Sequence, residues 1–333
     1  MEKKKLFGEI SLMNALLCIG VIVIHLTSFP VTSMDKSGVS YLLIYILNRF
    51  FVFCVPSFIF LSGLKLHNKY RGGINALSFY KNRTVKILVP YVFAVSVYFL
   101  YFLSKQWVFL NEYPLHLVLG TISAHFYYVV ISCQFYILFP LIIKIFEKYP
   151  GLILILSLVS TVIFQQFVHF PYSDRFFGSY VFYFVLGMYF SRNQVYGKLK
   201  KLSIPVYILS FVVCVIHISM LYFASRGIVF YRWGEIVNII YVTLSAFALY
   251  GLCGFFAKFP VVNKVSSAIS SNSYNIYLYH CLGISILKYD IFPPFNLSLG
   301  REFLFMSAVI FGGAALYCFY KYKSSDKSLQ EKV

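Results

Sequence analysis

Charged residues are scarce in this sequence, and acidic residues are the scarcest of them. Only 12% of the residues are charged, with 11 acidic residues against 29 Lys and Arg. No polar stretch is long enough to fold as a separate soluble domain, which excludes an appended catalytic module. Apolar residues make up 60% of the chain, in long runs that recur from end to end. The composition therefore predicts an all-α, polytopic membrane protein that forms a single integral membrane domain over residues 1–333.

Paired cysteines and a clear signal-peptide cleavage site are also missing. The seven cysteines include no CxxC pair and lie within or at the ends of apolar segments, so they are predicted to be small core residues, neither disulfides nor metal ligands. The N-terminal run begins with basic residues, as a signal peptide does, but its apolar part is long enough to span a bilayer. We therefore expect it to be the first membrane helix.

Apolar runs of about 20 residues, separated by polar or Pro- and Gly-rich breaks, predict about ten transmembrane helices and a multi-pass protein of the cell membrane. With the N-terminal lysines inside, 21 of the 29 basic residues lie on the inner side, which predicts that both termini are cytoplasmic and that the loop around Asn296 is external. The net charge of +18 then follows from topology and requires no nucleic acid partner. The expected segments are 8–28, 40–64, 87–104, 115–143, 151–169, 177–191, 203–224, 235–256, 268–287 and 301–320.

The first apolar run, "MNALLCIGVIVIHLTSF" at residues 13–29, contains one histidine, His25. An ionisable side chain inside a membrane helix is costly and marks a candidate functional site. A neutral imidazole that is hydrogen-bonded to another helix, or that lies at the outer interface, explains His25 alone equally well. Asn14 precedes it by about 16 Å of helix rise. The spacing predicts Asn14 near the cytoplasmic end and His25 in the outer half, where it can serve a substrate outside.

Polar residues recur at an inner helix end and in the fourth predicted helix. The segment "FYKNRTVKILVPYVF" places Arg83 and Lys86 three residues apart, expected on one helical face, where they suit a phosphate group or act as positive anchors of the helix. The segment "HFYYVVISCQFYILFP" carries His125, Gln134 and Tyr136, which favour a surface facing protein or water. An interhelical hydrogen bond is the simpler interpretation of Gln134.

A second histidine occurs late in the chain, in "SSNSYNIYLYHCLGI". Ser273, Tyr277 and His280 follow the spacing of one helical stripe, and the predicted topology places His280 toward the outside, as it does His25. Two histidines at comparable depth favour a cavity between their helices.

These motifs together resemble the membrane acyltransferase-3 family, whose helices pass acyl groups from cytosolic acyl-coenzyme A to acceptors on the other side of the membrane. The stretches "YYVVISCQFYILFPLI" and "NRFFVFCVPSFIFLSGL" are most similar to its intercellular adhesion protein C group, which is linked to poly-N-acetylglucosamine surface polysaccharide and proposed to succinylate it. The pieces that carry the resemblance, in chain order, are "ALLCIGVIVIH", "PSFIFLSG", "FYKNRTVKILVPY", "HFYYVVISCQFYILFP", "FYFVLGMYFS" and "SYNIYLYH".

The resemblance assigns roles to individual residues. His25 matches the family's proposed catalytic base, a role that the ordinary pKa of histidine suits. Asn14 stands where the family has an arginine, and Arg83 and Lys86 match its paired arginines before the third helix. A neutral amide cannot grip a phosphate as a guanidinium does, and lysine keeps the charge but loses the bidentate geometry. Asn14 therefore indicates either a divergent donor site or an enzyme that has lost activity.

The resemblance implies a membrane-bound O-acyltransferase. The donor would be acyl-CoA (acetyl-CoA or succinyl-CoA), held by Arg83, Lys86 and Asn14, and the acceptor a hydroxyl of a cell-surface polysaccharide or glycan, with no metal expected. The cavity is expected to be lined by His125, Gln134, Tyr136, Tyr277 and His280. Two alternatives are an exporter of a polysaccharide or of its lipid-linked precursor, and a non-catalytic partner in a polymer-synthesis complex. Homo-oligomerisation or a polymer-synthase complex is compatible with each.

Overall fold

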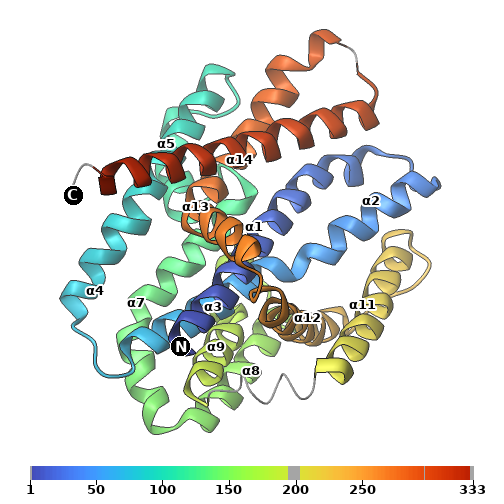
Figure 1. Cartoon of the computed structure of the whole chain (residues 1–333). Helices are drawn as coiled ribbons and strands as arrows, with labels where there is room; N and C mark the ends of the chain where they lie inside the picture. The colour runs from blue at the N-terminus through green and yellow to red at the C-terminus, as the bar shows by residue number, and fades with distance from the viewer. Residues whose placement is uncertain (1, 194–202, 296, 331–333) are drawn as a thin grey trace. The chain divides into compact units, whose positions relative to one another are not determined.

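The computed structural model describes residues 2–193, 203–295 and 297–330, and in these ranges the chain is helical with no β-strand (Figure 1). Four lysines of the predicted inner side, Lys198, Lys200, Lys201 and Lys332, lie outside the described residues, as does Asn296 in the predicted external loop. The helices are α1 (Glu2–Ser33), α2 (Val39–Phe50), α3 (Cys54–Tyr70), α4 (Ala76–Arg83), α5 (Val89–Ser104), α6 (Tyr113–Leu119), α7 (Tyr127–Lys148), α8 (Pro150–Gln166), α9 (Val181–Arg192), α11 (Ser203–Ser225), α12 (Gly234–Phe256), α13 (Pro260–Ile286) and α14 (Leu299–Gln330).

Seven helical segments among the described residues are long and apolar enough to cross a membrane, so the chain is a multi-pass, all-α membrane protein. Three further predicted segments correspond to α8, to α9, which has only 12 residues, and to α13, which carries a run of serines and asparagines. The count of ten and the cytoplasmic termini stay predictions. The seven segments are Gly8–Ser33, Val39–Tyr70, Ala76–Ser104, Ala124–Lys148, Ile204–Ser225, Gly234–Phe256 and Leu299–Ser324.

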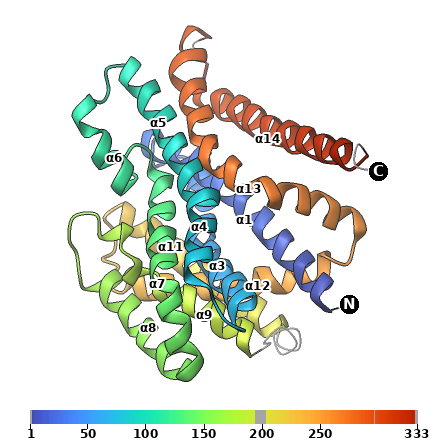
Figure 2. The same ribbon diagram turned by 90° about the vertical axis from the view of Figure 1, so that its left-hand side faces the viewer.

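The helices form two compact units that are interleaved along the chain. The first unit comprises residues 1–54, 218–229 and 246–333, and the second comprises residues 55–217 and 230–245. In the first unit, α1 packs along α13 and against α2, and α14 packs against α13 (Figures 1 and 2). In the second unit, α8 packs against α7 and α9, and α4 packs against α7. The single-domain assignment stays a prediction.

The pairing of α1 with α13 follows from the spacing of their side chains. Met13, Leu17 and Val21 are at most 1% exposed and recur every four residues, which makes one continuous buried stripe on α1. His25 takes the next position of the same stripe. The contacts of Asn14 with Ser273 and of His25 with His280 advance together along both helices, so α1 and α13 run in the same direction.

Two glycines set the distance between α3 and α9 in the second unit. A Cβ at Gly63 would lie 2.0 Å from the carbonyl oxygen of Phe184, and a Cβ at Gly187 would lie 2.0 Å from that of Phe60. Both contacts are with backbone, which cannot move aside as a flexible side chain can. Small residues of this kind let membrane helices approach closely.

Replacing Gly187 by alanine should therefore destabilise the second unit strongly. Overpacking typically costs about 1–3 kcal/mol, and we expect the upper end or more here because the added carbon meets backbone. Gly151→Ala is the matched control, since a Cβ at Gly151 meets nothing within 4 Å. Thermal unfolding of the purified proteins in detergent measures both, and equal midpoints for the two variants would contradict the close helix crossing.

Candidate functional site

The structure brings His25 and His280 together inside the first unit. Their ring centroids lie 5.1 Å apart with the planes tilted by 57°. The Tyr277 ring lies 5.8 Å from the His280 ring, one turn earlier on α13. Of the five side chains predicted to line a cavity, His280 thus lies beside the predicted base, Tyr277 lies beside His280, and the other three belong to the second unit.

His280 is held by its own helix in a defined orientation. Its Nδ1 lies 2.8 Å from the carbonyl oxygen of Tyr277 and 3.2 Å from that of Ile276. A carbonyl oxygen only accepts hydrogen bonds, so Nδ1 carries the proton and, in the neutral ring, Nε2 has the lone pair. That Nε2 lies 3.2 Å from the sulfur of Cys281. The backbone of α13 therefore sets both the tautomer and the direction of the ring.

His25, His280 and Cys281 also lie close enough together that they could hold a metal ion. One ligand atom from each lies within 4.8 Å of the others, and a histidine that donates its second ring N–H to a carbonyl is typical of metal ligands. Two imidazoles and a thiolate suit zinc or copper. Cys281 is predicted from the sequence to be a small core residue, although its place next to His280 is a signal for this cluster. The absence of a metal stays a prediction.

Asn14 is buried, and its amide nitrogen is directed at α13. It donates to the hydroxyl oxygens of Ser273, at 2.8 Å, and Ser270, at 3.2 Å, and lies 3.4 Å from the Ser270 carbonyl. Asn14, which the resemblance aligns with an arginine of the family, is therefore a link between α1 and α13. Sequence analysis places Ser273 on the stripe of His280, but it does not predict this link.

Arg83 lies in the second unit against two neighbouring aromatic rings. Its guanidinium carbon is 5.3 Å from the centre of the Phe79 ring and 5.0 Å from that of Tyr136. Its Nε is buried and has no hydrogen-bond partner among the described residues. The rings hold the cation in place by cation–π attraction, so the guanidinium is oriented and retains a donor for a ligand oxygen.

Lys86 is exposed and lies on a π-helical turn, Thr84–Leu88, that separates α4 from α5. The shared face predicted for Arg83 and Lys86 assumes regular α-helix. The structure has a π-helical turn here instead of a regular α-helix. Pro90 gives the physical reason, because it has no N–H to donate to the carbonyl four residues earlier and so interrupts the α-helical hydrogen bonding. The wider turn changes the angle between the two basic side chains.

The two remaining predicted site residues, Gln134 and His125, make hydrogen bonds within the second unit. Gln134 donates to the carbonyl of Arg175 at 2.7 Å and accepts from the backbone N–H of Phe177 at 3.0 Å, so it fixes the loop that precedes α9. His125 is fully buried, with Nδ1 3.0 Å from the Ser123 hydroxyl. Both arrangements fit structural roles.

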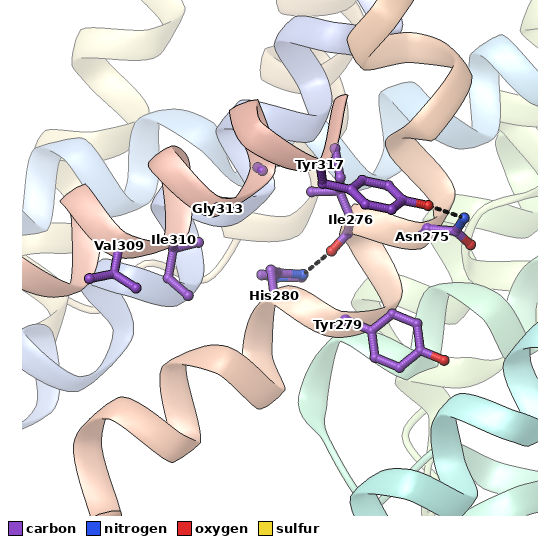
Figure 3. A pocket seen from close by; sticks show the side chains of 9 residues that line it. Asn275, Ile276, Tyr279, His280, Val309, Ile310, Gly313 and Tyr317 are labelled. Carbon is purple, nitrogen blue, oxygen red and sulfur yellow. Dashed lines mark hydrogen bonds between the residues drawn. The ribbon is translucent and has the colours of Figure 1, made fainter. Parts of the chain in front are cut away.

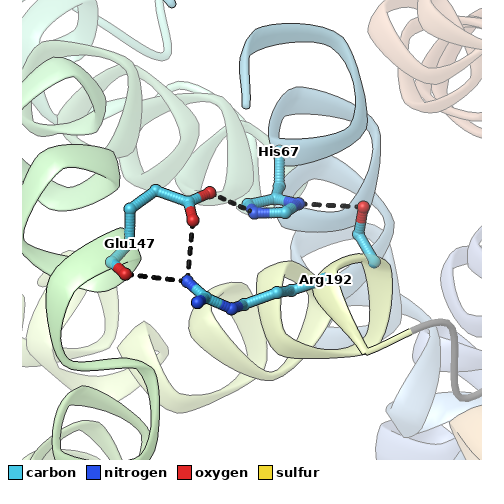
Figure 4. Close-up of polar contacts among 4 residues, drawn as sticks. His67, Glu147 and Arg192 are labelled. Atoms are coloured by element: carbon cyan, nitrogen blue, oxygen red, sulfur yellow. Dashed lines mark hydrogen bonds and ion pairs between the residues drawn. The ribbon is translucent and has the colours of Figure 1, made fainter. Parts of the chain in front are cut away.

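A polar network that sequence analysis misses joins the ends of α3, α7 and α9 (Figure 4). Glu147 lies 2.8 Å from Nε2 of His67 through one carboxylate oxygen and 2.7 Å from Arg192 through the other. The hydroxyl of Ser191 lies 2.9 Å from Nδ1 of His67. A Ser–His–Glu relay resembles that of a hydrolase. However, Ser191 and His67 are at most 2% exposed, which leaves no room for a substrate beside the hydroxyl. The network therefore holds the ends of the three helices together.

Comparison with known proteins gives one consistent family. The sequence model of the family described as "Acyltransferase domain" (acyltransferase-3) matches residues 7–319. A "Probable poly-beta-1,6-N-acetyl-D-glucosamine export protein" of Staphylococcus epidermidis is 26% identical over 300 residues, which cover 84% of this chain and 81% of that protein. A "Putative membrane-bound acyltransferase YfiQ" of Bacillus subtilis (strain 168) is 24% identical over 296 residues, covering 82% and 79%. No solved structure matches the chain significantly. Because the family model spans nearly the whole sequence, the chain belongs to the acyltransferase-3 family.

Proposed function

We propose that this protein transfers an acetyl or other short acyl group from cytosolic acyl-CoA to a hydroxyl of a cell-surface polysaccharide or glycan. Membership of the acyltransferase family supports the reaction class. The observation that carries the proposal is the pairing of His25 with His280, 5.1 Å apart in the first unit. The direct test is incubation of the purified protein with labelled acyl-CoA and glycan, followed by measurement of label in the glycan.

His25 acts as the general base in this proposal. It takes the proton from the acceptor hydroxyl while the oxygen attacks the thioester carbonyl carbon. The carbon–sulfur bond then breaks, and the proton passes from His25 to the departing thiolate, which leaves as the thiol of coenzyme A. No group is oxidised or reduced, and the acyl group ends as an ester on the acceptor.

His280 acts as a positioning residue for His25. Because its Nδ1 proton is committed to the carbonyl of Tyr277, its Nε2 can only accept a hydrogen bond, and the Cys281 sulfur lies 3.2 Å from it. In this proposal a protonated His25 or the acceptor hydroxyl replaces the Cys281 thiol as the donor to Nε2 during the reaction. Either contact stabilises the arrangement in which the proton moves.

Arg83 and Lys86 bind phosphates of coenzyme A in this proposal. The buried, unpartnered Nε of Arg83 supports it, because an oriented guanidinium binds phosphate oxygens strongly. Lys86 adds charge without fixed geometry. Asn14 contributes less than the family arginine would, since its amide nitrogen is engaged with Ser270 and Ser273.

Polysaccharide export is the second candidate, because the staphylococcal relatives are named as export proteins. A non-catalytic partner of a polymer-synthesis complex is the third. Only the enzyme requires affinity for coenzyme A, so binding of coenzyme A to the purified protein separates the first candidate from the other two.

The proposed base also predicts how the reaction responds to metals. A chelator should leave acyl transfer unchanged, whereas Zn²⁺ should inhibit it, because His25 cannot take a proton while it ligates a metal. Cys281→Ala removes one of the three ligands and should weaken the inhibition. The measurement is the transfer rate with EDTA and with increasing Zn²⁺. Loss of activity in EDTA that a divalent cation restores would contradict His25 as the free base.

A further inference from the structure

A cavity of about 500 Å³ lies between α13 and α14 in the first unit, and His280 forms part of its wall (Figure 3). Tyr279 and Asn275 line it from α13, and Ile310 and Gly313 line it from α14. The cavity therefore adjoins His280, whose ring lies 5.1 Å from that of His25. Its volume is that of a typical small-molecule site and is much larger than the volume of an acetyl group.

The walls of this cavity are mainly apolar, with polar groups at one end. There, Asn275 donates to the Tyr317 hydroxyl at 2.9 Å (Figure 3). A tyrosine hydroxyl that accepts one hydrogen bond still has its own proton to donate. The lining therefore combines a mainly apolar surface for a hydrocarbon chain with the polar side chains of Asn275, Tyr279, His280 and Tyr317, a pattern that suits an amphiphilic molecule.

The helix that forms the outer wall has the composition of a lipid-facing helix. Leu304, Leu316 and Phe319 on α14 are 65–71% exposed, and the segment is long and apolar enough to span the bilayer. A ligand dissolved in the bilayer meets such a helix directly.

From these observations we propose that the cavity between α13 and α14 binds the hydrocarbon chain of a lipid-linked acceptor and so presents the acceptor hydroxyl to His25 and His280. This inference rests on the proposed acyl transfer and names the class of its acceptor: a membrane-resident glycolipid. The apolar wall argues for a chain, the adjoining histidine argues for a reacting head group, and the lipid-facing α14 argues for entry from the bilayer.

Two adjacent glycines on α14 allow a matched test. A Cβ at either Gly312 or Gly313 meets nothing within 4 Å, so neither position clashes with the first carbon of a side chain, but only Gly313 lines the cavity. Gly313→Phe should fill the cavity, and Gly312→Phe is the control. The probe is decyl β-N-acetylglucosaminide with a photoreactive diazirine on its chain, and methyl β-N-acetylglucosaminide is the chain-free acceptor.

The expected result is a loss of chain binding in one variant only. Each methylene kept out of an apolar site lowers affinity by about fourfold, so exclusion of two or more predicts a drop of more than about tenfold. Gly313→Phe should lower photolabelling and the ratio of decyl to methyl acceptor transfer by that amount. Gly312→Phe should change neither, and labelled peptides from the wild type should come from α13 and α14.

Equal labelling of the two variants, or an unchanged ratio of transfer rates, would overturn the inference. So would displacement of the probe by decanoyl-CoA but not by excess unlabelled decyl glycoside, because the cavity would then hold the chain of the donor. A third outcome separates the two proposals. If the wild type transferred acyl groups to neither acceptor, while labelling still depended on Gly313, the proposed reaction would be wrong, but the cavity would still be a binding site for a hydrocarbon chain.

Discussion

Replacing His25 by alanine should lower the rate of acyl transfer by roughly 10²- to 10⁴-fold, the range that general-base catalysis typically supplies. The ring is packed beside His280, and no other described residue of the α1 stripe can accept a proton from a hydroxyl. Binding of acyl-CoA should survive, because the proposed donor contacts are made by Arg83 and Lys86. The fold should also survive, because a small cavity next to polar groups can take up water.

His169→Ala is the control for this variant, since His169 is an exposed histidine in the loop after α8. Its transfer rate should stay within about twofold of the wild type, as surface substitutions usually have small effects. A glycan-export assay on the same vesicles distinguishes the two leading functions. If His25→Ala left acylation intact while export stopped, the histidine would belong to a transport path.

Changing both Arg83 and Lys86 to glutamine should weaken coenzyme A binding by roughly 10- to 100-fold or more. A hydrogen bond to a charged group contributes about 1.5–3 kcal/mol, and about 1.4 kcal/mol corresponds to tenfold in affinity. Arg83→Gln alone should account for most of the loss, because this side chain is oriented by Phe79 and Tyr136 whereas Lys86 is exposed. The measurement is isothermal titration with coenzyme A.

Two controls separate a phosphate site from a general effect of charge. Lys81→Gln removes a neighbouring exposed basic residue on α4 and should leave the affinity unchanged. Rising salt should weaken binding to the wild type and have less effect on the double variant, because the lost contact is ionic. Unchanged affinity in the double variant would reduce Arg83 and Lys86 to anchors of the inner helix end.

The helical architecture could be predicted from the sequence because its causes are local. Long apolar runs require helices in a membrane, whatever the rest of the chain does. The meeting of His25 with His280 was also within reach, since two histidines at similar predicted depth suggested a shared cavity. The α1 stripe of Met13, Leu17 and Val21 shows why they meet, because it fixes the face of α1 that contacts its neighbours.

The contacts that sequence analysis misses depend on which helices become neighbours. His67, Glu147 and Ser191 are far apart in sequence, and nothing local marks them as partners. The resemblance to the family marks Asn14 as a departure from its pattern. Only the packing of α1 on α13 shows that Ser270 and Ser273 accept its hydrogen bonds. The π-helical turn is different, because Pro90 gives a local signal for it.

The central claim is that this protein moves an acyl group from a thioester to a hydroxyl. The most direct measurement reconstitutes the wild-type protein in vesicles, supplies acetyl-CoA or succinyl-CoA labelled in the acyl group, and follows the label in glycan and glycolipid acceptors by mass spectrometry. The proposed function predicts ester-linked label in the acceptor, released by mild base, together with one coenzyme A thiol for each ester formed. Export of unmodified glycan, with no label in any acceptor and no coenzyme A released, would contradict it.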